Sequence, residues 1–274
     1  MANIHIVAGA GETPAHPVIR KINASDLFEA LAKGLQDFLA MPSHLVFLGL
    51  IYPIVGICLA ALTFSNNALP LIYPLASGFA LVGPFAAIGL YEISRRRELG
   101  LPTSWMNAFD VLRSPSIPSI IALGVVLLII FLAWLMTARA LYESLFGYAA
   151  PESYVQFLGQ VLDTPEGRRM IIFGNVIGFA FAVLVLSISV ISFPLLLDRD
   201  VGVAVAVYTS VKAVAKNPLM LALWGLIVAA ALLIGSLPLF VGLAIVMPVL
   251  GHATWHLYRR VVEPPPVEEA HPAT

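Results

Sequence analysis

Residues 170–197 read MIIFGNVIGFAFAVLVLSISVISFPLLL and contain no acidic or basic side chain. The stretches 38–91 and 218–251 are equally free of charge. A helix needs roughly 20 apolar residues to cross the hydrocarbon core of a bilayer, where its backbone must satisfy its own hydrogen bonds. The sequence therefore predicts a polytopic helical membrane protein of the all-α class.

The composition supports this class and excludes others. The chain is 59% hydrophobic and only 11% charged, whereas about a quarter of the residues of a soluble domain are charged. A net charge of −1 lacks the clustered basic excess that a nucleic-acid partner requires. The single cysteine, Cys58, lies inside an apolar stretch, so no disulfide can form within the chain.

The apolar stretches divide into six predicted transmembrane helices, at about 44–64, 69–92, 117–141, 170–197, 218–236 and 238–258. A five-span alternative replaces the last two helices by one long bent helix. In the six-span arrangement all but three of the 15 Lys and Arg fall on one side of the membrane. Because basic loops stay in the cytoplasm, we expect both termini to be cytoplasmic.

Each odd-numbered span follows a segment with apolar residues spaced three and four apart, at 25–41, 103–114 and 203–217. This spacing is typical of an amphipathic helix that lies in the membrane interface. A proline follows each segment, at Pro42, Pro115 and Pro218, and suits the first turn of the next helix.

The hairpin ends also resemble one another. PFAAIGLYEISRR (Pro84–Arg96) and PVLGHATWHLYRR (Pro248–Arg260) keep the same interval from proline to arginine. We therefore expect three hairpin repeats, each preceded by an interfacial amphipathic helix and related by a pseudo-threefold axis near the membrane normal. The units cover about 25–97, 103–200 and 203–260 of a single membrane domain, 25–262, with a partly disordered tail at 1–24 and a disordered one at 263–274.

Ionisable residues near the cytoplasmic ends of the spans form a candidate polar cluster of Glu92, Asp198, Asp200, His252 and His256. His252 and His256 are four apart and so share one helix face, and Glu92 matches His256 in the repeat. Ionisable groups at membrane depth are functional candidates, but these also suit plain anchoring at the headgroup level. A zinc-protease helix would need Glu where Ala253 stands. We therefore assign no catalytic residue, metal or cofactor.

Asn175 is the strongest polar residue within a predicted span, and Gly174 and Gly178 flank it. Small residues let transmembrane helices approach closely, and an asparagine there can hydrogen-bond across the contact. These three residues predict a helix-packing site, and a substrate contact at Asn175 is the alternative.

Three segments carry a family resemblance: GPFAAIGLYEISRR (Gly83–Arg96), FPLLLDRDVG (Phe193–Gly202) and GHATWHLYRR (Gly251–Arg260). They resemble the hallmark segments of the bacterial integral-membrane family catalogued as domain of unknown function 2189, and the resemblance extends over about residues 18–262. It implies a bacterial inner-membrane protein of about six spans, in a family without an established activity.

Three functions fit these observations. The first is a non-enzymatic structural or accessory component, with membrane lipids or other membrane subunits as partners. The alternative is a small transporter or channel for an apolar or amphiphilic solute, which the repeats and the prolines within the spans favour. The lack of mid-membrane charge disfavours coupling of such transport to protons or sodium. The third is a metal- or haem-linked role through His252, His256 and Glu92. Substrate and oligomeric state stay open.

Overall fold

The computed structural model describes residues 17–41, 70–71, 73–75, 83–84, 87–149, 151–238 and 241–264. The predicted first span, 44–64, lies outside the described residues, and so do 69, 72, 76–82 and 85–86 of the second. The main helices are α2 (Ala24–Ala40), α5 (Ile88–Glu98), η2 (Trp105–Arg113), α6 (Ile117–Phe146), α7 (Tyr154–Asp163), α8 (Pro165–Ser189), α9 (Ser192–Asp198), α10 (Gly202–Lys216), α11 (Pro218–Ser236) and α12 (Leu243–Val261).

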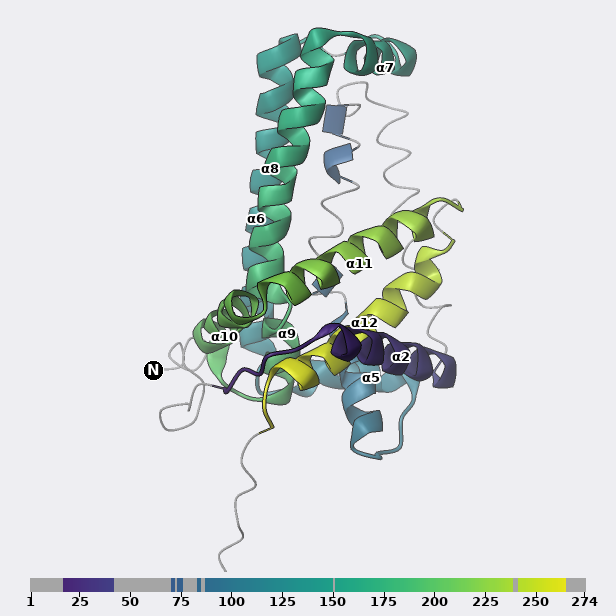
Figure 1. Ribbon diagram of the computed structural model, residues 1–274, viewed down its shortest axis with the longest axis vertical. Coiled ribbons are helices and arrows are strands. Elements are labelled where there is room, and N and C mark those ends of the chain that lie inside the picture. The colour runs from purple at the N-terminus through teal and green to yellow at the C-terminus, as the bar shows by residue number, and fades with distance from the viewer. Residues whose placement is uncertain are drawn as a thin grey trace, which may run out of the picture.

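Three helical segments of the described chain are long and apolar enough to cross a membrane: α6, the segment Pro165–Asp198 formed by α8 and α9, and α11. They correspond to the predicted third, fourth and fifth spans. In Figure 1, α6 and α8 stand side by side, and α7 lies across their upper ends. The all-helical membrane class is therefore confirmed.

The six-span arrangement goes beyond what the described residues establish. The predicted sixth span, 238–258, corresponds to α12, which begins only at Leu243 and is not among the candidate spans. The C-terminal half of α12 carries two histidines and two arginines and is largely buried against α2 and α5. This half therefore packs against the basal helices, and its histidines and arginines lower the hydropathy of α12 below that of the candidate spans.

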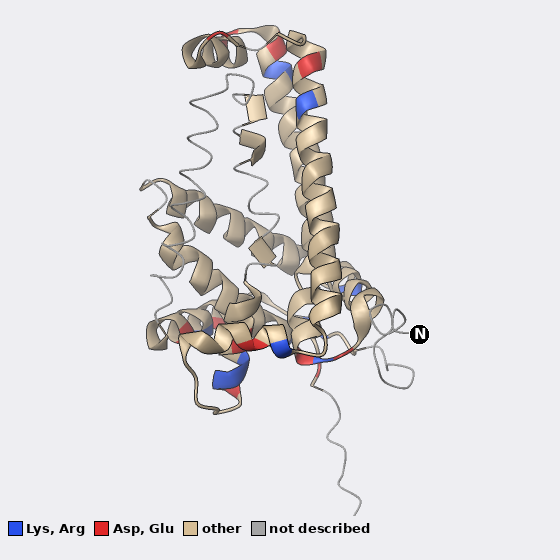
Figure 2. Cartoon of the chain, turned by 180° about the vertical axis from the view of Figure 1, so that it is seen from behind, with Lys and Arg blue, Asp and Glu red and all other residues tan. Residues whose placement is uncertain are grey.

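Charged side chains gather at two ends of the molecule, with uncharged helix between them (Figure 2). We call the lower end in Figure 1 the basal end; it holds α2, α5, η2, α9, α10 and the C-terminal half of α12. The opposite, distal end holds α7 and the adjoining ends of α6 and α8. This separation is the one that a hydrocarbon layer between two polar surfaces requires.

The three predicted amphipathic segments correspond to α2, η2 and α10. Asn23 caps α2 through a capping box with Asp26, which satisfies amides that the first helical turn leaves free. The segment η2 is a 3₁₀-helix, whereas the sequence predicts an α-helix there. In a 3₁₀-helix residues i and i+3 are eclipsed, so Met106, Phe109 and Leu112 form one exposed apolar stripe.

Helix α2 crosses α12 at very short range. A Cβ atom on Gly34 would lie 2.6 Å from the backbone nitrogen of Ala253, so only glycine fits there. Around this crossing Leu27, Trp255 and Tyr258 are almost completely buried. Close backbone approach thus joins an early helix to the last one.

This crossing predicts opposite effects for two Gly→Ala substitutions. Gly34→Ala should destabilise the protein by about 1–3 kcal/mol, because the new methyl group meets backbone atoms that cannot move away. Gly159→Ala in α7 meets only a side-chain oxygen at 3.7 Å and should be neutral or stabilising by up to about 1 kcal/mol. Thermal unfolding in detergent measures both. Equal melting temperatures for the two variants would contradict the crossing.

Candidate functional site

Two pockets open at the basal end, and we call the larger one the α5–η2 pocket. It encloses about 350 Å³. It lies where α6 begins and where the segment Pro165–Asp198 ends, so it is at the end of two candidate spans. Its charged lining residues are Glu92, Arg95, Arg96, Asp110, Arg113, Asp198, Arg199 and Asp200.

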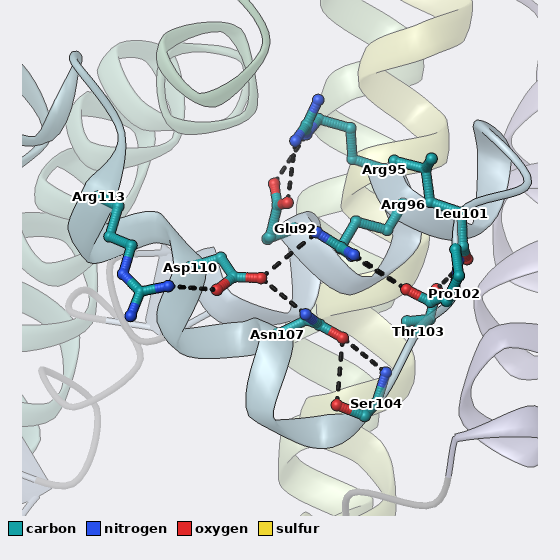
Figure 3. Close-up of polar contacts among 10 residues, drawn as sticks. All are labelled: Glu92, Arg95, Arg96, Leu101, Pro102, Thr103, Ser104, Asn107, Asp110 and Arg113. Carbon is teal, nitrogen blue, oxygen red and sulfur yellow. Dashed lines mark hydrogen bonds and ion pairs between the residues drawn. The ribbon is translucent and has the colours of Figure 1, made fainter.

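Glu92 and Arg95 form a bidentate ion pair in this pocket (Figure 3). Arg95 Nε donates to Glu92 Oε2 at 2.7 Å, and Arg95 Nη2 donates to Oε1 at 2.9 Å. Glu92 is only 3% exposed. A buried carboxylate needs such a partner, because removing one ion from water without the other is costly.

A second set of contacts fixes the turn between α5 and η2 (Figure 3). Arg96 Nη1 donates to Asp110 Oδ2 at 3.3 Å, and Arg96 Nη2 donates to the Pro102 carbonyl at 3.0 Å. Asn107 Nδ2 donates to the same Asp110 oxygen at 2.7 Å, and Asn107 Oδ1 accepts the Ser104 amide at 2.7 Å. Arg96 and Asn107 thus each bind both Asp110 and a backbone atom of the turn, which fixes the position of the Asp110 carboxylate in the pocket wall.

The other site is a buried cluster around Asp37, which we call the Asp37 cluster. Ser94 Oγ donates to Asp37 Oδ2 at 2.6 Å, and Arg97 Nε donates to Oδ1 at 2.7 Å. Nε2 of His256 lies 2.8 Å from Oδ2 and donates to it, since an ionised carboxylate can only accept. The cluster thus ties α2, α5 and α12 together through one carboxylate.

The proton positions in the cluster follow from the single hydroxyl proton of Ser94. Because that proton goes to Asp37, the serine oxygen accepts from Nδ1 of His252, 2.8 Å away. His252 is completely buried, and its Nε2 has no hydrogen-bond partner among the described residues. A neutral ring with its proton on Nδ1 leaves only a lone pair unsatisfied at Nε2, at lower cost than a buried N–H.

The Asp37 carboxyl titrates far from its ordinary range. Burial alone would raise its pKa, but hydrogen bonds from His256, Ser94 and Arg97 favour the ionised form and lower the pKa from 3.8 to about 2. Asp37 is 6% exposed. The carboxylate is therefore a fixed negative charge at any physiological pH.

The structure divides the five predicted polar residues between these two sites. Glu92, Asp198 and Asp200 line the α5–η2 pocket, whereas His252 and His256 belong to the Asp37 cluster. Within the described part of the chain, no group of three His, Cys, Asp or Glu side chains is arranged to hold a metal ion.

The predicted packing residues lie on α8. Asn175 Oδ1 accepts from the hydroxyl of Tyr73 at 2.9 Å, which links two segments about a hundred residues apart in the chain. A Cβ on Gly178 would lie 3.1 Å from the Trp134 ring of α6, so this glycine gives the indole room. Gly174 faces Leu141 of α6 at 3.7 Å.

Asp37, Ser94 and Arg97 are site residues that the sequence reasoning missed. One signal was present: Asp37 stands five residues before Pro42, as Asp110 stands five residues before Pro115. Both aspartates pair with an arginine at the end of α5. Comparison of the amphipathic segments by position, and not only by their apolar spacing, could have identified Asp37.

Apolar helices with charges confined to two ends define a helical integral-membrane protein. Residues 71–198 match the family described as predicted integral membrane protein, domain of unknown function 2189. The match confirms the resemblance found in the sequence; it includes Gly83–Arg96, and the third resembling segment, Gly251–Arg260, lies beyond it. Searches of curated proteins and of solved structures gave no significant match.

The Asp37 cluster predicts a specific loss of acid stability. Because the folded chain lowers the pKa of Asp37, the ionised carboxyl stabilises the fold above pH 3.8, and this contribution disappears as the pH falls toward about 2. Asp37→Asn should cost about 2 kcal/mol at pH 7, since Arg97 and His256 lose a charged acceptor.

Thermal unfolding of both proteins between pH 7 and pH 2 measures this effect. The variant should lose less stability than the wild type on acidification, because it lacks the group that titrates. The exposed Asp163→Asn in α7 is the matched control and should follow the wild-type curve. Parallel pH curves for wild type and Asp37→Asn would contradict the assignment.

Proposed function

We propose that the protein is a non-enzymatic component of the bacterial inner membrane that organises lipids of the cytoplasmic leaflet through its basal end. The match to a family of predicted integral membrane proteins supports a membrane location. The excess of Lys and Arg supports the orientation, since only Arg139, Arg168 and Arg169 of the described basic residues belong to the distal end. The basal end and both termini are then cytoplasmic.

The exposed apolar side chains of α2, η2 and α10 are the observation that carries this proposal. Each element also bears charged residues and lies at the basal end of the candidate spans. The exposed apolar residues are Phe28, Leu35 and Leu39 on α2, Trp105, Met106, Phe109 and Leu112 on η2, and Tyr208 and Val211 on α10. Amphipathic elements at this level insert between headgroups and acyl chains.

We also infer the three-unit repeat from the way these elements pack. The element η2 of the second unit packs on α5, the end of the first hairpin, and α10 of the third unit packs on α9, the end of the second. Helix α2 of the first unit packs on α12, the end of the third hairpin. This cyclic order is the one expected of three units around a common axis.

Two of the junctions use small residues at matching positions. Gly34 of α2 contacts Ala253, and Gly89 of α5 contacts Ala108 of η2 so closely that a Cβ on Gly89 would lie 2.9 Å from that of Ala108. Gly89 and Ala253 each stand five residues after a proline, Pro84 and Pro248. Equivalent close approaches support a common origin for the first and third hairpins.

We call the three amphipathic elements α2, η2 and α10 the collar. When inserted into one leaflet, the collar acts as a wedge, that is, it adds volume to that leaflet only. Its side chains occupy area among the headgroups of one leaflet without an equal area in the other, so the collar favours curved or locally reordered bilayer. No catalytic step is needed for this action. The same exposed faces could instead bind other membrane subunits, and the protein would then be an accessory component of a membrane complex.

Transport of an apolar or amphiphilic solute is the alternative function. The α5–η2 pocket supports it only at one end of the spans, since its lining residues all belong to the basal end. Solute flux in proteoliposomes above protein-free controls would favour transport over the lipid-organising role.

Sorting between flat and curved bilayers tests the proposal. Wild-type protein in giant vesicles should accumulate in membrane tubes drawn from them. Alanine at Met106, Phe109 and Leu112 should reduce the enrichment, because it removes roughly 4 kcal/mol or more of apolar burial in the leaflet.

The control replaces three exposed residues of the span α8, Ile172, Val176 and Val183, by alanine. This variant should sort like the wild type, because these side chains lie along a span and not in the collar. Equal tube enrichment of all three proteins would contradict the wedge.

A further inference from the structure

We propose that the α5–η2 pocket binds the phosphoethanolamine headgroup of a phospholipid from the cytoplasmic leaflet. The proposal rests on the lipid-organising role above and names the lipid that this role selects. The pocket volume of about 350 Å³ falls in the range of small-molecule sites, about 300–1,000 Å³.

The position of the pocket suits a lipid headgroup. Ser114, Pro115 and Ser116 line it immediately before α6 begins, and Leu197 and Asp198 line it where the candidate span Pro165–Asp198 ends. The ends of spans lie at the level of the headgroups. Exposed apolar residues of α6, beginning with Ile121 and Val125, continue from the pocket toward the distal end and offer a surface for acyl chains.

Most charges of the pocket neutralise one another. Glu92 pairs with Arg95, Asp110 with Arg96, and Asp198 with Arg199, at N–O distances of 2.7, 3.3 and 3.5 Å. These pairs leave one cation and one anion of the lining, Arg113 and Asp200. The pocket is therefore complementary to a ligand with one negative and one positive group.

Arg113 and Asp200 are both available to a ligand. The Arg113 side chain is 88% exposed, and its single ion-pair contact in the described chain is Asp110, at 3.9 Å. Asp200 is exposed and has no ion pair or hydrogen bond with the described residues. Figure 3 places Arg113 at the edge of the polar network, beyond Asp110.

The chemistry of the two groups selects the headgroup. A guanidinium binds phosphate oxygens through paired N–H donors, so Arg113 would take the phosphate. Asp200 would accept hydrogen bonds from a primary ammonium. A choline headgroup has no N–H to donate, and a glycerol headgroup has no cation, so both should bind more weakly than ethanolamine.

Native mass spectrometry of the full chain in mild detergent tests this site, with short-chain phosphatidylethanolamine, phosphatidylcholine and phosphatidylglycerol at equal concentrations. The wild type should bind the ethanolamine lipid best. Arg113→Gln should weaken all three lipids about fivefold, since each carries a phosphate, and an exposed ion pair contributes up to about 1 kcal/mol. Asp200→Asn should weaken the ethanolamine lipid by a similar factor, the choline lipid less, and the glycerol lipid, which has no cation, not at all.

Arg139→Gln, near the end of α6 that adjoins α7, is the matched control and should change none of the affinities. Equal binding of the three lipids, or unchanged binding by Arg113→Gln and Asp200→Asn, would overturn the site. If the wild type still sorts into membrane tubes while these binding results are negative, the headgroup site is wrong but the lipid-organising role stands. Soluble phosphoethanolamine that binds through both residues while the lipid does not would also overturn the lipid assignment.

Discussion

The exclusion of charge from hydrocarbon is the constraint on which the rest of this structure depends. The candidate spans satisfy their backbone polar groups internally and present apolar side chains outward, so ionisable groups must lie at the two ends. At the distal end the short helix α7 lies across the ends of α6 and α8. At the basal end it concentrates nearly all the polar chemistry of the described chain into a layer formed by three amphipathic elements and the hairpin ends on which they pack.

The two polar sites of that layer occupy comparable junctions but use their charges differently. In the Asp37 cluster, one buried carboxylate accepts hydrogen bonds from donors on α5 and α12, so it holds three helices together. In the α5–η2 pocket, three ion pairs form a stiff and neutral frame, and Arg113 and Asp200 are left over at its edge. One junction is thus built for stability, and the other for recognition at the membrane surface.

Much of this fold was predictable because hydrocarbon imposes a simple rule on sequence. Charge-free runs located α6, α8 and α11, and spacings of three and four located α2, η2 and α10. The Asp37 cluster was not predictable in the same way. Its partners lie 57 and 219 residues away along the chain, and an isolated aspartate on an amphipathic helix is usually solvated. The sequence analysis also grouped Glu92 with His252 and His256, because equivalent positions in a repeat, such as Glu92 and His256, predict similar depth but not the same junction.

The depth of η2 in the bilayer tests the central claim most directly. A nitroxide at Phe109→Cys, in a Cys58→Ser background and reconstituted in lipid, reports its collisions with oxygen, which concentrates in hydrocarbon, and with a water-soluble nickel chelate. The account predicts that oxygen dominates for Phe109, while a nitroxide at Arg113→Cys on the same element favours the chelate. Dominance of the chelate at Phe109 would place η2 in water and contradict the insertion of the collar into the leaflet.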